Sequence, residues 1–372
     1  MKILHVLNSD FGSASTMGYR SYQIVKNSGV DIHVFCRANL SKDIKRNVSK
    51  PYPFVRWYSR ATQLVLKTFG QGIFYNVLKK VEIDIFSFQA KKFISNSQII
   101  HFFYHDERLI DYAKSQGKKV IIEAFSHPDY LKKMRKDGIQ FDSDNDTSDD
   151  HSIPCYEKSD VIISPSLWIS ENLSYAGLPK AKVNFIPYGV HPQTDKVYSD
   201  LDKLRIVFAG GLKRTKGILE LVEAVANIDQ NSVELFIYGR MHNSVARQIK
   251  ERVKNNSNIY IKGFSENIID EYKKGDLYVY PTYFEGSSKT VFEAMSCGLP
   301  VITTFNAGSI VRDNLDGFIV PVNDAYAISE KIQFFLENSM SLVEMGRSAQ
   351  VFSREFSWEK YAVSVSNIYK LV

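Results

Sequence analysis

Thr282-Tyr-Phe-Glu-Gly-Ser-Ser-Lys-Thr-Val-Phe-Glu-Ala-Met-Ser-Cys-Gly-Leu-Pro-Val301 places two carboxylates, Glu285 and Glu293, eight positions apart across an expected helix start. The apolar, aromatic run 276–281 before it predicts a buried parallel strand. Residues 286–288 have turn chemistry and a capping hydroxyl before the helical run 289–297. A helix that starts at the carboxyl end of such a strand offers free amides to an anion. A carboxylate on each side of this phosphate cradle suits a sugar nucleotide.

A structural interpretation of Glu293 stays open, because Thr290 and Glu293 also have the spacing of a capping box. Glu293 would then only bond the backbone amide of Thr290. Lys289 favours an anion, since the helix dipole disfavours a cation in the first turn by roughly 0.3–1 kcal/mol. A bound phosphate would remove that conflict. The expected donor contacts in this segment are Ser288, Lys289, Thr290 and Glu293.

Length and composition predict two domains. A chain of 372 residues with 44% hydrophobic content exceeds the ~250–300 residues that a single core usually supports. Three widely spaced cysteines without a CxxC pattern indicate neither a disulfide framework nor a zinc site, and we expect buried thiols in a reducing cytosol. The apolar core after Met1 is too short for a signal peptide, and no stretch approaches the ~18 apolar residues of a membrane span.

Strand and helix patterns alternate along the whole chain, which predicts parallel sheets covered on both faces. The strands expected in the first half are 2–7, 31–36, 99–103, 119–123, 161–164 and 183–186. Those in the second half are 205–209, 234–238, 258–261, 277–280, 301–304 and 317–320, with helices near 217–228, 243–254, 266–274 and 289–297. Two doubly wound sheets follow, joined by a linker at 187–192, with a cleft between their carboxyl edges.

A second phosphate signal occurs at Ile206-Val-Phe-Ala-Gly-Gly-Leu-Lys-Arg-Thr-Lys-Gly217, again a strand, a glycine turn and a helix. Lys213, Arg214 and Lys216 gather at the amino end of that helix, where cations are unfavourable unless they share an anion with it. The segment lacks the spacings of the Rossmann dinucleotide fingerprint and of the P-loop. We therefore expect a diphosphate site that is neither of these.

With these motifs the chain resembles the retaining glycosyltransferases of family 4, which have the GT-B architecture of two facing Rossmann-like domains with a cleft between them. The resemblance covers essentially the whole chain. It rests on the block from Glu285 to Val301, supported by 209–217, Ile186-Pro-Tyr-Gly-Val190, Asp316-Gly-Phe-Ile-Val-Pro321 and Phe356-Ser-Trp-Glu359. It implies an amino-terminal acceptor-binding domain of residues 1–192 plus 357–372, and a nucleotide-sugar-binding domain of residues 193–356.

The resemblance also implies roles for single residues. In such enzymes the first glutamate contacts the donor sugar, the second binds the ribose hydroxyls, and the lysine of a Lys-Gly pair neutralises the diphosphate. The resemblance implies these three roles, in the same order, for Glu285, Glu293 and Lys216. The final helix, 357–372, is implied to cross back onto the first domain, and Phe264 is implied to border the base.

Two amino-terminal positions complete the expected site. Gly12 lies in the loop after the first strand, where a glycine allows backbone to approach the diphosphate or acceptor closely. His127 follows the fourth expected strand, at the place where similar proteins carry a histidine facing the donor sugar. His101 and His105 are competitors for that role, and a histidine after a strand is more often structural.

The chain departs from the family pattern at several positions. Gly211 replaces the usual arginine of the phosphate clamp, so Lys213 or Arg214 would have to supply the charge. His191 replaces an acid or amide after Gly189-Val190. Ser287 and Ser288 replace the commoner Phe-Gly, which leaves the preferred sugar open.

The expected reaction is transfer of a sugar from a nucleoside diphosphate donor to an acceptor hydroxyl with retained anomeric configuration. Cations and helix ends would stabilise the leaving diphosphate without a metal ion or cofactor. The run 142–146 has a DxD spacing, but its polar surroundings favour a solvated loop. A nucleotide-sugar epimerase of the same fold and a non-catalytic nucleotide- or carbohydrate-binding relative remain alternatives.

The chain carries its positive charge unevenly. Residues 41–92 hold eleven Lys or Arg against three Asp or Glu, whereas the entire chain has a net charge of +6. Aromatic residues and a helical apolar pattern over 64–78 accompany this charge, so the stretch could rest on an anionic membrane. An ordinary amphipathic helix packed on its own domain is the other interpretation. Nucleic acid is disfavoured because no nucleic-acid motif is present. We expect a cytoplasmic protein, peripheral at the inner membrane face, with a saccharide or lipid-linked acceptor.

Overall fold

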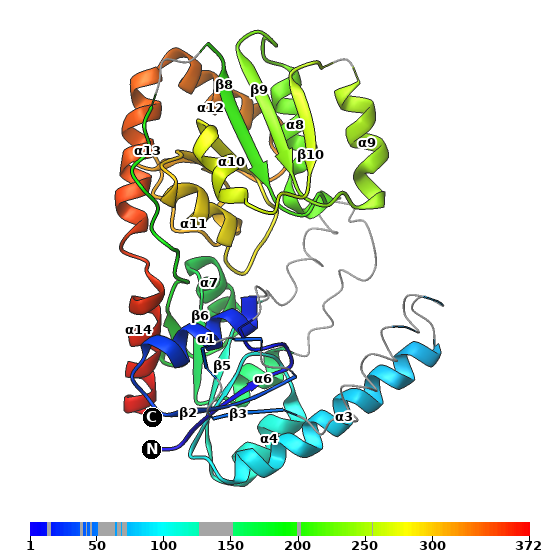
Figure 1. The fold of residues 1–372 in the computed structure, drawn as a ribbon, viewed down its shortest axis with the longest axis vertical. Coiled ribbons are helices and arrows are strands. Elements are labelled where there is room, and N and C mark those ends of the chain that lie inside the picture. The colour runs from blue at the N-terminus through cyan, green and yellow to red at the C-terminus, as the bar shows by residue number, and fades with distance from the viewer. Residues whose placement is uncertain are drawn as a thin grey trace.

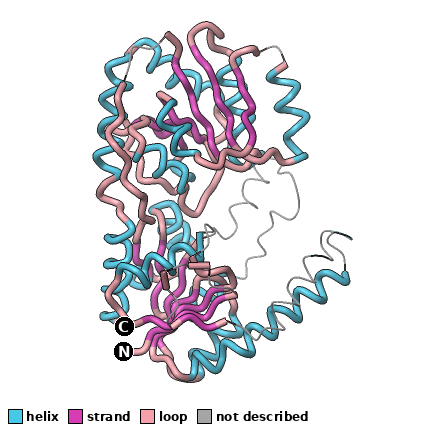
Figure 2. The backbone as a smooth tube through the Cα atoms, viewed as in Figure 1, coloured by secondary structure: helices cyan, strands magenta, loops and turns pink. Residues whose placement is uncertain are grey.

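The computed structural model describes residues 1–12, 16–37, 40–41, 43–44, 47–50, 64, 68, 73–125, 152–198, 202–254 and 256–372. Within these ranges the chain forms two parallel sheets, one after the other, and Figure 1 shows them as two lobes along the long axis of the molecule. Helices flank the strands of both lobes, as Figure 2 shows. The prediction of two doubly wound α/β domains is therefore confirmed.

The first sheet has the strand order β3-β2-β1-β4-β5-β6-β7, and every pair in it is parallel. Its strands are β1 (Ile3–Leu7), β2 (Ile32–Cys36), β3 (Val48–Ser49), β4 (Ile99–Phe102), β5 (Lys119–Glu123), β6 (Val161–Ser164) and β7 (Val183–Phe185). The helices of this lobe are α1 (Thr16–Asn27), α3 (Ile73–Ser95), α4 (Glu107–Ser115), α6 (Ser152–Lys158) and α7 (Leu167–Tyr175), with a short 3-10 turn η2 (Lys180–Lys182). Nearly continuous apolar runs in β1, β4 and β6 are buried on both faces, as a parallel sheet requires.

The second sheet has the order β10-β9-β8-β11-β12-β13 and is also parallel. Its strands are β8 (Leu204–Ala209), β9 (Val233–Tyr238), β10 (Ile259–Gly263), β11 (Leu277–Tyr280), β12 (Val301–Thr303) and β13 (Gly317–Ile319). Its helices are α8 (Ile218–Ala226), α9 (Asn243–Val253), α10 (Ile268–Lys274), α11 (Lys289–Ser296), α12 (Ala325–Glu337) and α13 (Ser339–Ser353), with 3-10 turns η3 (Arg214–Lys216) and η4 (Phe305–Ala307). The order reverses between β8 and β11, so the crevice at the carboxyl ends of these two strands is the expected ligand site.

The chain passes between the two lobes twice. In the first passage, Tyr188 packs in the core of the first sheet, whereas Lys196 donates hydrogen bonds to the carbonyls of Lys273 and Gly275 at the end of α10. The second passage leads from α13 to the last helix, α14 (Trp358–Leu371). The two passages touch, because the Val190 amide donates to the Phe356 carbonyl at 2.8 Å. Residues 190–196 are thus the part of the linker that changes from one lobe to the other.

Helix α14 lies against α1 of the first lobe, as the resemblance implied, and a buried polar network holds it there (Figure 1). The Tyr369 hydroxyl lies 2.8 Å from His5 Nε2 and 2.7 Å from His101 Nδ1. The Tyr361 hydroxyl donates to Glu123 Oε1 at 2.7 Å, and Glu123 also pairs with Arg20 of α1. The domain boundaries at 192 and 357 themselves stay predictions.

Helix α3 carries part of the basic stretch. Phe86, Ala90 and Ile94 on its carboxyl-terminal part are buried in the first lobe, whereas Val77 is 54% and Phe88 76% exposed. In Figure 1 its amino-terminal part extends away from the sheet. Most of residues 51–72, and with them much of the apolar pattern over 64–78, lie outside the described residues. The helix therefore packs on its own domain through Phe86, Ala90 and Ile94, while Val77 and Phe88 present apolar side chains to solvent.

Candidate functional site

The turn after β8 is built around Gly217. Its φ is +67°, and a Cβ there would lie 2.0 Å from the carbonyl oxygen of Pro281. A larger residue would therefore be strained and would push the two chain segments apart. Gly217 also precedes the first residue of α8, so the backbone comes close to the next loop at a helix amino end. This packing explains why position 217 is a glycine.

The loop after β11 is fastened to that turn. The backbone amide of Tyr283 and the hydroxyl of Thr282 both donate to the Thr215 carbonyl, each at 2.9 Å. The Thr304 hydroxyl in turn donates to the Thr282 carbonyl at 2.6 Å. The loops that follow β8, β11 and β12 therefore form one unit at the carboxyl edge of the second sheet.

Lys216 and Glu285 meet at the centre of this unit. Lys216 Nζ lies 2.5 Å from Glu285 Oε1, and their side chains are 19% and 26% exposed. The hydroxyl of Tyr280, at the end of β11, donates to the same carboxylate oxygen at 2.7 Å. Burial, together with the neighbouring carboxylate, raises the pKa of Tyr280 well above its usual value, so the hydroxyl keeps its proton. The site thus holds a cation and a carboxylate that are partly open to solvent.

Glu293 lies on α11 and does not form the capping box. The helix starts at Lys289 with Ser288 as its N-cap residue, so Glu293 stands too far along for that motif. Its carboxylate instead lies 2.9 Å from Lys289 Nζ, an i,i+4 pair that partly offsets the unfavourable position of the lysine. The structural interpretation of Glu293 as a capping residue is therefore wrong, and the Glu293 side chain is 15% exposed.

The start of α11 also carries one unsatisfied hydroxyl, that of Ser287. Ser288 makes no side-chain cap to the helix backbone, and its Oγ lies 3.3 Å from Thr290 Oγ1. Ser287 Oγ is buried and has no hydrogen-bond partner among the described residues. Buried hydroxyls are normally satisfied, so such an atom beside a helix amino end fits a segment that receives an anionic ligand.

The two cations that could replace the absent arginine differ in their surroundings. Arg214 lies 3.1 Å from Glu220 Oε1 and 3.4 Å from the Tyr283 hydroxyl, so its guanidinium is part of a structural cluster. Lys213 is exposed, and Gly211 beside it has open space where a Cβ would be. Lys213 is therefore the cation that is freer to reach a phosphate.

The first lobe contributes backbone to the site. A Cβ on Gly286 would lie 2.6 Å from the Phe125 carbonyl oxygen, and Ser166 Oγ donates to the Gly286 carbonyl at 2.7 Å. The ring of Phe284 packs against the core of the first lobe. Gly12, after β1, has a φ of +74°, and a Cβ there would lie 2.8 Å from Ser41 N. The loop that carries Glu285 is therefore in direct contact with both domains.

The three candidate histidines, His101, His105 and His127, differ in what the structure shows of their surroundings. His127 lies outside the described residues, so its predicted role is untested. His101 is fully buried between Tyr369 and Glu123, and burial holds its pKa well below the usual value. His105 stacks on the Phe125 ring at 4.4 Å, and burial lowers its pKa to about 4. His101 is thus structural. His105 is neutral and stacks on Phe125, the residue whose carbonyl lies beside Gly286 in the loop of Glu285.

A cavity of about 250 Å³ lies between the lobes beside Glu293. Its lining residues are Tyr19, Gly189, Val190, His191, Gln193, Ile269, Lys289, Glu293 and Trp358. His191, which departs from the family pattern, has its Nε2 2.5 Å from the Tyr19 hydroxyl. The linker is thereby attached to α1 at the edge of the cavity.

Phe264 follows β10 and is 65% exposed, with the Arg240 guanidinium 5.2 Å from its ring centre. An exposed aromatic ring at the carboxyl edge of the sheet is compatible with the implied contact to a base. Sequence reasoning did not single out Tyr280, Thr282 or Ser166. Tyr280 stands only five residues before Glu285. It ends an apolar strand, so the sequence pattern predicts a core residue there and does not indicate a contact with Glu285.

Three properties of the described part of the chain bear on further expectations. No group of three or more His, Cys, Asp or Glu residues there could hold a metal ion, and the DxD run at 142–146 lies outside it. No described helix is both long and apolar enough to cross a membrane. The three cysteines are buried free thiols, as predicted.

Comparisons with known proteins agree with this geometry. Residues 203–338 match the family described as "Glycosyl transferases group 1". An uncharacterised glycosyltransferase of Methanocaldococcus jannaschii is 30% identical over 218 residues, which are 57% of this chain and 60% of that protein. A capsular polysaccharide biosynthesis glycosyltransferase of Staphylococcus aureus is 28% identical over 170 residues, 43% of this chain and 45% of that protein. The chain thus spans less than two thirds of either relative.

A solved Anabaena protein in complex with UDP and glucose has the same fold over 100% of both chains, with a TM-score of 0.71 and 14% identity. The resemblance to glycosyltransferases and the prediction of a GT-B fold are confirmed. Membership of family 4 in particular stays a prediction.

Proposed function

Because the chain has the GT-B fold and carries a group 1 glycosyltransferase segment over residues 203–338, we propose that it is a retaining glycosyltransferase. It transfers a hexose from a nucleoside diphosphate sugar to an acceptor hydroxyl. The observation that carries this proposal is the contact of Lys216 with Glu285 in the loops at the carboxyl edge of the second sheet. A cation and a carboxylate held together there suit a diphosphate joined to a sugar.

The donor is assigned to the unit formed by the loops after β8 and β11. Lys216, Lys213 and the amides at the start of α11 would bind the diphosphate, because a helix amino end favours an anion. Glu293 would leave Lys289 to accept hydrogen bonds from the ribose, and Phe264 would border the base. Glu285 would contact the sugar. UDP-glucose is a reasonable first donor and UDP the matching leaving nucleotide, since the Anabaena protein of the same fold was solved with each of them.

Catalysis in this proposal is electrostatic. Negative charge grows on the leaving diphosphate as the glycosidic bond loosens, and preorganised cations and helix ends stabilise it. No metal ion or other cofactor is assigned a part. Glu285 and His127 are the proposed catalytic residues on the sugar side, with Gly12 giving room for the backbone of the first lobe to approach.

The acceptor is proposed to be a saccharide or a lipid-linked saccharide of the cell envelope. Curated relatives act in capsular polysaccharide biosynthesis and as a poly(glycerol-phosphate) alpha-glucosyltransferase, which supports a polymer acceptor. We also propose peripheral binding to an anionic membrane on the cytoplasmic side through α3. Val77, Val81 and Phe88 are exposed there beside Lys80 and Lys92.

A panel of nucleoside diphosphates and their sugars in a thermal-shift assay, followed by turnover with the stabilising donor, tests the proposal. We expect one nucleotide to raise the melting temperature and its sugar to be consumed only when an acceptor is present. An epimerase would instead change the donor sugar without acceptor. A binding protein would be stabilised but would consume nothing. Flotation with liposomes that contain anionic lipid tests the membrane contact, and failure to float contradicts it.

A further inference from the structure

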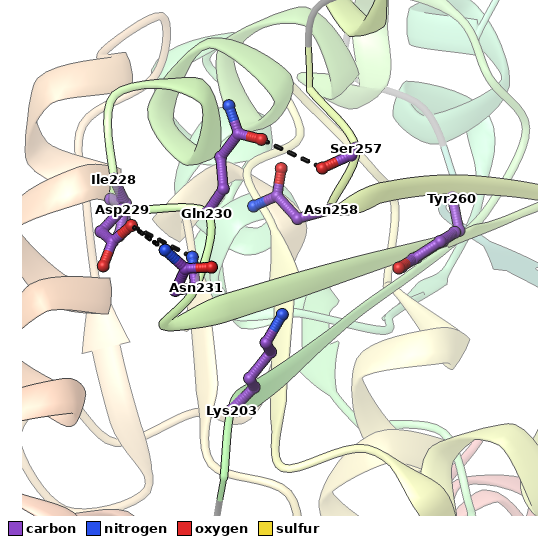
Figure 3. Close-up of a pocket in the computed structure, with 8 residues that line it drawn as sticks. All are labelled: Lys203, Ile228, Asp229, Gln230, Asn231, Ser257, Asn258 and Tyr260. Carbon is purple, nitrogen blue, oxygen red and sulfur yellow. Dashed lines mark hydrogen bonds between the residues drawn. The ribbon is translucent and has the colours of Figure 1, made fainter.

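A polar pocket lies at the amino edge of the second sheet (Figure 3). Its residues stand just before β8, β9 and β10 or at the start of β10: Lys203, Ile228, Asp229, Gln230, Asn231, Ser257, Asn258 and Tyr260. The volume is about 480 Å³, within the ~300–1,000 Å³ of ligand pockets. A six-residue strand such as β9 separates the two edges by about 17–20 Å. The pocket is therefore distinct from the proposed donor site.

The chemistry of the walls restricts what can bind. All lining residues except Ile228 are polar, and they include amides, hydroxyls, one carboxylate and one ammonium. An apolar ligand would leave these groups without hydrogen bonds, which is unfavourable. A ligand rich in hydroxyl groups can instead donate and accept at each wall. This is the hydrogen-bonding character of a saccharide.

Internal hydrogen bonds hold part of this wall in place before any ligand arrives. The Asp229 carboxylate accepts from the Asn231 amide at 3.1 Å and from Ser232 Oγ at 3.3 Å. Ser257 Oγ donates to Gln230 Oε1 at 3.1 Å, a bond drawn in Figure 3. The Asp229 charge is thus used within its own turn, and the pocket is preorganised.

Two polar groups, the Lys203 ammonium and Asn258 Oδ1, have no hydrogen-bond partner among the described residues. Lys203 is half-buried and has neither an ion pair nor a hydrogen bond to any residue that the structure describes. In Figure 3 its ammonium points into the space bounded by Asn231, Asn258 and Tyr260. Asn258 is 3% exposed and donates to the Val233 carbonyl, but its Oδ1 has no partner among the described residues. The Asn258 acceptor is not exposed to the pocket, so the signal for a ligand is Lys203, because a cation without a counter-charge favours an anionic ligand.

We infer that this pocket binds one unit of an acidic saccharide, with a carboxylate or phosphate substituent on Lys203 and ring hydroxyls on the amides. The role of the pocket rests on the proposed function. It would hold a part of the acceptor polymer remote from the cleft and so raise the effective concentration of the acceptor end at the site of transfer.

Saturation-transfer NMR on the full-length protein tests the inference, with glucuronate and glucose 6-phosphate as acidic probes and glucose as the neutral one. Saturating UDP is added to occupy the cleft. Lys203→Ala removes the charge, and Ser257→Trp fills the pocket from an exposed position. Lys250→Ala on α9 is the control, because it removes an equally positive, exposed side chain away from the pocket.

We expect both acidic probes to bind wild type and Lys250→Ala more tightly than glucose does. Each pocket variant should raise the dissociation constant for the acidic probes about tenfold. Equal binding of all three sugars, no saturable binding, or binding unchanged in both pocket variants would overturn the inference. The NMR readout needs no turnover. A protein that binds these probes but has no transferase activity would contradict only the proposed function. A protein that is active but does not bind the probes would contradict only this inference.

Discussion

Lys216 Nζ lies 2.5 Å from Glu285 Oε1, although the two residues are 69 positions apart and belong to different loops. The contact exists because the loops after β8 and β11 share the Thr215 carbonyl as an acceptor and because Gly217 lets them touch. It joins the two phosphate signals of the sequence into one site.

Replacing Glu285 by Gln should abolish most of the turnover and leave nucleotide binding intact. The amide keeps the shape and the contact to Tyr280 but removes the charge that faces the sugar, so we expect a loss in kcat of about 10²-fold or more. Nucleoside diphosphate affinity should change by less than about threefold, as measured by calorimetry. Glu330→Gln, an exposed glutamate on α12, is the matched control. Equal loss of turnover in both variants would count against a role for Glu285.

Lys213 and Arg214 should separate into a ligand-binding and a structural cation. Lys213→Gln should raise the dissociation constant of a nucleoside diphosphate about tenfold with stability unchanged within about 0.5 kcal/mol. Arg214→Gln leaves the nearly buried Glu220 without its cation, so the free energy of unfolding should fall by about 1–3 kcal/mol. Urea unfolding and nucleotide titration of both variants measure this. The reverse pattern would assign the phosphate contact to Arg214.

Gly217→Ala should destabilise the protein more than Gly29→Ala. Both glycines have a φ of +67°, so both variants incur the left-handed strain of about 1–2 kcal/mol. Only at position 217 does the new Cβ meet a carbonyl oxygen, at 2.0 Å, whereas nothing lies within 4 Å of a Cβ at position 29. The additional cost should be at least about 1–3 kcal/mol in urea unfolding. Equal losses would show that the loops separate without cost.

Stability should fall as the pH drops below 6.5, and His5 should account for part of the fall. Burial lowers the pKa of His5 from 6.5 to about 3, so the unfolded chain takes up a proton in this range and the folded protein does not. One such histidine contributes up to about 1.4 kcal/mol per pH unit, which amounts to about 1.6 kcal/mol between pH 6.5 and 5. Denaturant unfolding of wild type and His5→Gln at both pH values measures this. If the free energy of unfolding of His5→Gln fell as much between the two pH values as that of wild type, the prediction would be contradicted.

The sequence predicted the fold and the main site residues because both depend on local patterns. Apolar runs such as 277–280 are long enough to specify buried strands, and the glycine turns mark where loops leave the sheet. The pairing of Lys216 with Glu285 could be expected only from their places at adjacent carboxyl strand ends. Its use of one oxygen of Glu285, shared with Tyr280, depends on side-chain packing that no local pattern encodes.

Other features were beyond the reach of local patterns. The capping-box interpretation of Glu293 failed because the N-cap residue is Ser288, two residues before the Thr290 that the motif needs. The network of His5, His101 and Tyr369 joins positions up to 364 residues apart, and nothing in the sequence links them.

A crystal structure of the protein soaked with a nucleoside diphosphate sugar tests the central claim most directly. We predict a diphosphate within hydrogen-bonding distance of Lys216 Nζ and the first amides of α11, with the ribose hydroxyls on Glu293 and the sugar beside Glu285. An empty crevice at saturating donor, or a donor bound elsewhere while Glu293 stays paired with Lys289, would contradict the account.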